Sequence, residues 1–92
     1  MKYFSWSDEK NEFLKAERQV SFEDIVFYIE LGYLLDVLEY KGQKIFVVQV
    51  EEYVYLVPFI EDEHEIFLKT IIPSRKATKN YLKGSFYVKT DI

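Results

Sequence analysis

The chain has 92 residues, of which 49% are hydrophobic and none is cysteine, and its formal net charge is −4. This length makes one domain (1–92) with a compact core, and the lack of cysteine excludes disulfides and thiolate chemistry. No apolar run approaches the ~20 residues of a membrane span, and the first residues lack the apolar core of a signal peptide. We therefore expect a cytoplasmic protein without membrane association.

The first predicted elements are a short strand and two helices. Lys2 to Trp6 favours a short extended segment, and Ser7 is a good N-cap for a helix that ends near Arg18. Ser21 opens a second helix, because SFED has the form of a capping box. Its apolar side chains recur at the spacing of an amphipathic helix: Phe22, Ile25, Val26 and Ile29. Gly32 predicts where that helix stops.

Beyond the second helix the apolar period changes to two, which is typical of strands. Four strands are predicted, at 34–40, 45–51, 53–60 and 66–72. The sequence KGQK at 41–44 predicts a hairpin turn between the first two. Pro58 cannot donate a backbone hydrogen bond, so its strand is expected to be bulged there or to lie at an edge. The strand at 66–72 is apolar on both faces and is expected to be central.

A short cationic helix is predicted after the last strand. Pro73 is expected to end the strand, Ser74 to cap the helix, and Gly84 to stop it after Lys83. Helical spacing puts apolar residues on one face and cations on the other: Ala77, Thr78, Tyr81 and Leu82 against Arg75, Lys76, Lys79 and Lys83. Residues 85–92 are expected to form a last strand or to stay mobile. This order predicts an α+β fold with two N-terminal helices, a four-stranded, mainly antiparallel sheet and a C-terminal basic helix.

Charge is distributed unevenly along the chain. Residues 66–92 contain six Lys or Arg side chains against Asp91 alone, a net charge of +5, so residues 1–65 carry −9. A local basic face indicates where a polyanion docks, and the cations of the last helix are suited to hold phosphates. An ordinary solvated helix face explains the same pattern equally well.

Other kinds of site find little support in the sequence. His64 is the only histidine and lies in EDEHE without H-E-x-x-H spacing, so a solvated turn is favoured over a metal ligand. Ser21 and Ser74 are better explained as caps than as nucleophiles. Tyr53 and Tyr55 lie at period two on one sheet face, where core packing or a partner interface is favoured over base stacking. No metal or cofactor is predicted.

Three short stretches resemble the motifs of a known family. That family opens with W-D-x-x-K, continues to K-H-G-V-S-F-E, and carries I-I-S-A-R-[RK]-A-[TS]-[RK] near its end. The matching residues are Trp6 and Lys10, then 20–23, and finally 71–72 and 75–79. On these residues the chain resembles the BrnT-type toxins of bacterial type II toxin–antitoxin modules, which are small ribonucleases with a RelE-like fold.

The chain departs from the family pattern at two places. Ser7 stands where the family has Asp, and Glu17, Arg18 and Gln19 stand where it has Lys, His and Gly. The absent histidine removes an acid–base group, so Lys or Tyr must transfer protons if the chain cleaves RNA. Arg18 keeps a cation at that place, which suits phosphate binding.

The resemblance implies a toxin that inhibits translation as a metal-independent endoribonuclease. It also implies a cognate antitoxin, DNA-binding and encoded nearby, that neutralises the toxin in a hetero-oligomer. Our catalytic candidates are Arg75 for the charge of the transition state and Lys76 or Lys69 as proton carriers. The predicted RNA-binding residues are Lys79, Lys83, Arg18, Lys10 and Tyr81.

Two alternatives come from other functional classes. In the first, the 75–83 helix grips an acidic partner or nucleic acid without any chemistry. In the second, the chain is a structural domain whose aromatic sheet face pairs with another subunit.

Overall fold

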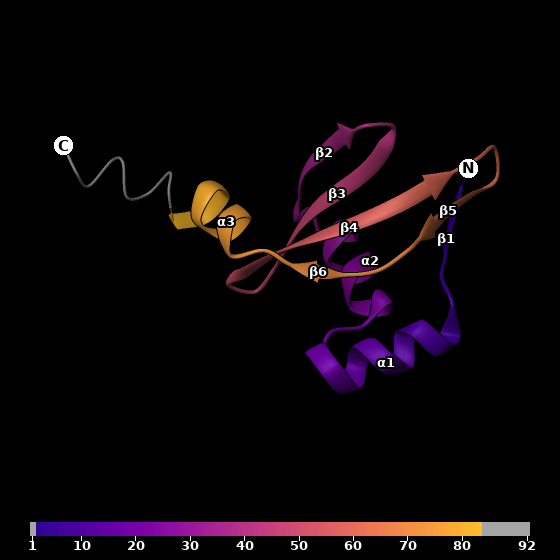
Figure 1. The fold of residues 1–92 in the computed structure, drawn as a ribbon, viewed down its shortest axis with the longest axis horizontal. Coiled ribbons are helices and arrows are strands. Elements are labelled where there is room, and N and C mark those ends of the chain that lie inside the picture. Colours follow the sequence, from indigo (N-terminus) through magenta and orange to yellow (C-terminus); the bar gives the residue numbers. More distant parts are fainter. Residues whose placement is uncertain (1, 84–92) are drawn as a thin grey trace.

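The computed structural model describes residues 2–83, and within them six strands form one mixed sheet (Figure 1). The strands are β1 (Tyr3–Ser5), β2 (Leu34–Tyr40), β3 (Gln43–Val50), β4 (Tyr53–Glu61), β5 (Glu65–Leu68) and β6 (Ile72–Pro73). The helices are α1 (Asp8–Arg18), α2 (Phe22–Glu30) and α3 (Arg75–Thr78), and a π-helical segment, η1 (Lys79–Lys83), continues α3. The predicted α+β fold is confirmed. The predictions for Gly84 and for residues 85–92 lie outside the described residues.

The strand order is β1-β5-β4-β3-β2, and β6 pairs with β4 beyond the end of β5. The antiparallel meander from β2 to β5 is as predicted. In addition, β1 pairs with β5 in parallel, so the first strand of the chain joins the sheet beside the fifth. The most central strand is β4, because it pairs with β3 on one side and with both β5 and β6 on the other.

The single strand predicted at 66–72 is divided in two. Phe59 of β4 pairs with Leu68, whereas Leu56 pairs with Ile72. Between these two pairs, the two residues 57–58 of β4 therefore lie opposite the three residues 69–71 that connect β5 to β6. Pro58 lies at this irregularity, as expected for a residue without an N–H, and its carbonyl accepts from the Lys69 N–H at 2.9 Å. The strand ends at Pro73, as predicted, because Pro73 is the last residue of β6. Pro73 belongs to β6, where it is tolerated because β6 has a neighbour on one side only.

Local signals position the two N-terminal helices. The Ser7 side chain accepts from the backbone N–H of Lys10 and begins α1. Ser21 begins α2 with a complete capping box, since its hydroxyl accepts from the Asp24 N–H while the Asp24 carboxylate accepts from the Ser21 N–H, both at 3.0 Å. Gly32 follows α2 with φ of 101°, the left-handed conformation typical of a helix stop.

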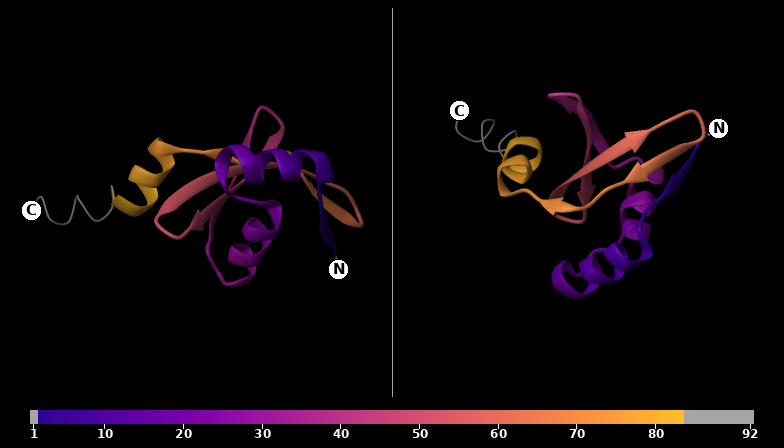
Figure 2. Two further views of the ribbon diagram at one scale, coloured as in Figure 1. Left: turned by 90° about the horizontal axis from the view of Figure 1, so that it is seen from below. Right: turned by 45° about the vertical axis from the view of Figure 1, so that its right-hand side comes forward.

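The two faces of the sheet carry different helices (Figures 1 and 2). Helices α1 and α2 cover one face, where Phe22 and Ile25 are fully buried and Ile29 is half-buried against the same core. The other face carries a smaller core of Val47, Val54 and Ala77, which α3 covers at one end of the sheet. Within residues 2–83, no helix is long and apolar enough to cross a bilayer.

Candidate nucleic-acid interface

Two hydroxyl side chains attach the cationic helix to the sheet. The Ser74 hydroxyl accepts from the Ala77 N–H at 3.0 Å, and the Ser74 N–H donates to the Val54 carbonyl at 3.1 Å. The buried Thr78 hydroxyl accepts from the Val54 N–H and donates to the Ser74 carbonyl, both at 2.8 Å. Because these bonds join the first turn of α3 to β4, the orientation of the helix on the sheet is fixed.

With that orientation, the cations of the helix point away from the core. Ala77 is buried and Leu82 is packed against the smaller core, whereas three cations are exposed: Arg75, Lys76 and Lys79. We call these three side chains the cationic cluster. Within residues 2–83, the charged groups of these three side chains form no ion pair and no hydrogen bond. The predicted division of the helix into an apolar and a cationic face is therefore confirmed for these residues. The side chain of Lys83 lies outside the described part of the structure.

Tyr81 differs from its prediction as a member of the buried face. Its side chain is 37% exposed, and its hydroxyl donates to the Asp36 carboxylate on β2 at 2.9 Å. This bond raises the pKa of Tyr81, since Asp36 accepts a hydrogen bond from the protonated hydroxyl and its negative charge disfavours the phenolate. Tyr81 consequently links η1 to the edge strand β2, with its hydroxyl turned toward an acidic group.

Arg18 reaches the segment that leads into the cationic helix. Its guanidinium donates to the Ile71 carbonyl, directly before β6. Lys10 lies two turns earlier on α1, about 12 Å along the helix axis, and its ammonium sits over the Phe13 ring at 5.5 Å. The structure therefore places Arg18, but not Lys10, beside the chain that precedes the cationic cluster.

Lys69 is separated from the other two catalytic candidates. Its backbone N–H bonds to Pro58, whereas that of Ser74 bonds to Val54, four residues earlier on β4 and about 13 Å away along a strand. Its ammonium donates to the Gln43 side chain at 2.9 Å, beside the β2–β3 hairpin. Of the two proposed proton carriers, Lys76 is thus the one adjacent to Arg75.

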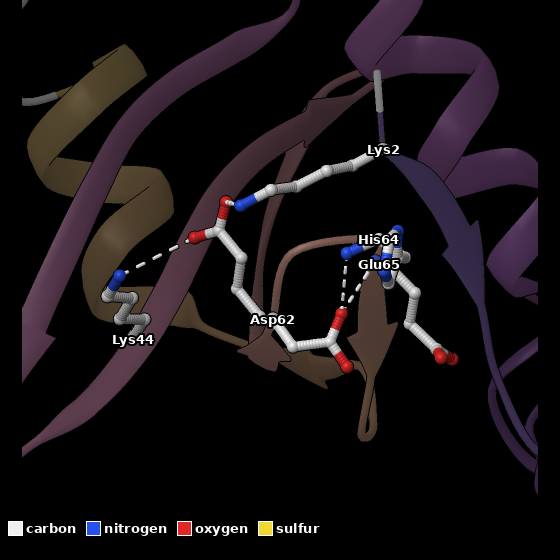
Figure 3. A network of polar contacts seen from close by, with 6 residues as sticks. Lys2, Lys44, Asp62, His64 and Glu65 are labelled. Carbon is white, nitrogen blue, oxygen red and sulfur yellow. Dashed lines mark hydrogen bonds and ion pairs between the residues drawn. The ribbon is translucent and has the colours of Figure 1, made fainter.

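His64 lies in the β4–β5 turn, at the end of the sheet opposite α3 (Figures 1 and 3). Its side chain is exposed, and its backbone N–H donates to the Asp62 carboxylate at 2.8 Å. Asp62 also accepts from the Glu65 N–H, and these two bonds lower the pKa of its carboxyl. The interpretation of EDEHE as a solvated turn is confirmed. In the described part of the chain, no three His, Cys, Asp or Glu side chains gather as a metal site.

Beside this turn, Figure 3 shows a small ion-pair network at the end of β4. Glu61 pairs with Lys2 at 2.5 Å and with Lys44 at 3.4 Å, and the hydrogen bond from Lys2 is the largest cause of the lowered pKa of Glu61. These cations are neutralised within the protein. They therefore differ from the cationic cluster, whose charges have no such partners in residues 2–83.

Sequence reasoning missed the residue that anchors the helix. Thr78 was assigned to the apolar face, but it bonds to β4 with its hydroxyl while its backbone continues the helix. No sequence pattern marks such a bond, because it depends on how the helix and a strand 24 residues away are placed.

Comparison with known proteins gives one informative likeness. No protein-family model matches the chain, and no curated protein matches its sequence. The fold and the cationic cluster define a small α+β protein with two helices on one sheet face and a basic helix after the last strand. The crystal structure of the Brucella abortus ribonuclease toxin BrnT is similar to this chain, with a TM-score of 0.62 and 13% sequence identity over 80% of this chain and 97% of that one. The chain therefore has a BrnT-type fold.

Proposed function

We propose that the protein is the toxin of a type II toxin–antitoxin module and that it cleaves RNA in the cytoplasm. A fold alone hosts many functions, so the proposal depends on the site. The observation that carries it is the cationic cluster: three exposed side chains, without an ion-pair partner in residues 2–83, on a helix fixed to the central strand. The BrnT-type fold supports the same conclusion, because the similar structure is that of a ribonuclease toxin.

The assigned chemistry needs no cofactor. A ribose 2′-oxygen attacks the adjacent phosphorus and expels the 5′-oxygen of the next nucleotide, which leaves a cyclic phosphate. Arg75 stabilises the charge of the pentavalent phosphate through a bidentate contact. Lys76 donates a proton to the departing 5′-oxygen, and the proton of the 2′-hydroxyl passes to water. Lys79 and Arg18 contact phosphates of the RNA backbone.

The decisive experiment compares Arg75 with a cation elsewhere. We expect induced expression of the wild-type chain to arrest bacterial growth, and Arg75→Ala to abolish both arrest and RNA cleavage. Loss of one such contact typically lowers the rate about 10²–10³-fold. Arg75→Lys should restore activity only in part, because an ammonium cannot make the bidentate contact. The control is Lys41→Ala, which removes the same charge at the exposed β2–β3 turn and should leave cleavage unchanged.

The second candidate function is a module that grips RNA without cleaving it. The residue at position 18 favours it: Arg18 stands where the family has histidine, bonds to the Ile71 carbonyl and cannot give up a proton in an acid–base step. In that case purified protein leaves RNA intact, and Arg75→Ala only weakens RNA binding and makes its salt dependence shallower. That pair of results would contradict the enzyme proposal.

A further inference from the structure

An open groove of about 610 Å³ lies on the helix-covered side of the β3–β4 hairpin. It is lined by the residues that follow α1 (Gln19 and Val20), by one side of α2 and by the hairpin turn. Its charged lining is entirely acidic, with Asp24 on α2 and Glu51 and Glu52 in the turn. Within the described residues, no Lys, Arg or His contributes to the lining, and none of the three carboxylates belongs to an ion pair. A bound cation would therefore meet negative charge on both walls of the groove and no competing positive charge from its described lining.

The remaining lining is aromatic. Tyr28, Tyr53 and Tyr55 are half-buried, and the rings of Tyr53 and Tyr55 meet edge to face with centroids 5.5 Å apart. Burial, with smaller contributions from Tyr53 and Glu51, raises the pKa of Tyr55, so its hydroxyl stays protonated and can donate. Aromatic faces next to carboxylates attract ammonium and guanidinium groups, because ring electrons and negative charge act on the same cation.

The turn presents its carboxylates in a fixed backbone conformation. Glu51 has φ of 58°, and the Gln49 side-chain amide donates to the Glu51 carbonyl at 2.9 Å. On the opposite wall, one oxygen of Asp24 is occupied by the Ser21 N–H. The groove is thus lined by groups from separate elements rather than by one mobile loop.

Alternation along β4 separates this groove from the cationic cluster. Val54 faces the cationic helix, so Tyr53 and Tyr55 on either side of it face the groove. One end of the sheet therefore has an anion-attracting face and a cation-attracting face. Ligands of opposite charge can occupy the two faces at the same time.

We propose that this groove binds a Lys- or Arg-bearing peptide segment of a partner protein. Charge complementarity selects a basic ligand, and the open shape admits a chain rather than enclosing a small molecule. A cationic side chain lies over Tyr53 and Tyr55, and its charged group contacts Glu51 and Glu52. This binding does not depend on RNA cleavage, so either proposal can fail without the other.

The test titrates fluorescein-labelled hexa-arginine into the full chain and follows fluorescence anisotropy at physiological salt. We expect the double variant Glu51→Gln/Glu52→Gln to raise the Kd about tenfold or more. The control Glu39→Gln/Glu63→Gln removes the same charge at two exposed positions outside the groove and should change the Kd less than about twofold. Equal losses in both double variants would overturn the proposal, because the peptide would then bind the acidic protein non-specifically.

Two further measurements complete the test. Tyr53→Leu should also weaken hexa-arginine binding, with a thermal melt to verify that the variant folds. Unchanged affinity in a folded Tyr53→Leu variant would contradict the role of the aromatic lining. Spermine, a small tetracation without a peptide backbone, should compete only weakly. Full displacement of the peptide by equimolar spermine would overturn the assignment to a peptide segment.

Discussion

Asn11 is a buried polar residue that joins the two N-terminal helices. Only 3% of it is exposed. Its carbonyl accepts from the Phe22 N–H at the start of α2, and its amide donates to the Glu23 carboxylate, both at 2.8 Å. No sequence signal marks Asn11, since a single Asn within a helical stretch belongs to no pattern that reveals its partner. Its contribution depends on a contact that only the folded chain creates.

We predict that Asn11→Ala lowers the free energy of unfolding by about 1–3 kcal/mol, because it leaves the Phe22 N–H buried without an acceptor. Urea denaturation at neutral pH measures this loss. Asn80→Ala, at an exposed position of η1, serves as the matched control and should cost less than about 0.5 kcal/mol. Equal effects of the two substitutions would show that the buried bonds contribute nothing.

The same substitution should show a dependence on pH. The pKa of Glu23 is lowered from 4.5, first by its bond to Asn11. A carboxyl with a depressed folded pKa contributes stability above its unfolded pKa and loses it as the pH falls through the folded value. The difference between wild type and Asn11→Ala should therefore be largest above about pH 4.5 and shrink below it. A difference that grows on acidification would contradict this linkage.

At the scale of elements, predictions from sequence succeeded where the signals are local. The capping box, the apolar stripe and Gly32 define α2 without reference to any other part of the chain. The stretch 66–72 was predicted as one strand, yet it is divided into β5 and β6. The reason is Pro58 on the neighbouring strand, which shifts the register there. A residue on another strand decides this break, so the pattern of 66–72 alone does not contain it.

We predict that Ile25→Ala costs about 2–5 kcal/mol, because Ile25 is fully buried between α2 and the sheet. Ile29, one turn later on the same stripe, is half-buried, so Ile29→Ala should cost clearly less. Chemical denaturation of both variants under identical conditions gives the comparison. If Ile29→Ala proved the more costly, the tilt of α2 on the sheet would have to differ from the one described.

At the scale of the whole molecule, the structure shows which of the candidate site residues lie close to one another and which do not. Arg75, Lys76 and Lys79 share a helix face, which helical spacing was sufficient to predict. Lys69 was grouped with them because it is near in sequence. The extended path through β5 and β6 carries it away, toward the β2–β3 hairpin. Arg18, distant in sequence, approaches the same segment through the Ile71 carbonyl.

We predict that a neutralising partner covers the cationic cluster. If the proposed function holds, the protein encoded beside this chain should co-purify with it, and amide hydrogen exchange over residues 74–83 should slow in the complex. The loop 61–65, at the other end of the sheet, provides an internal control whose exchange should stay unchanged. Tight binding without any protection over 74–83 would place the interface elsewhere and contradict masking of the cluster.

The parallel pairing of β1 with β5 has a consequence for how the chain is made. Residues 3–5 are synthesised first, but they can pair with a strand only after residues 65–67 have been synthesised. The apolar sides of α1 and α2 also remain uncovered until β3, β4 and β5 have left the ribosome. Such long-range contacts slow folding and prolong the exposure of hydrophobic surface that promotes aggregation. Translation that stops before the codons of β5 therefore yields a fragment that cannot form the complete sheet and leaves apolar helix faces exposed.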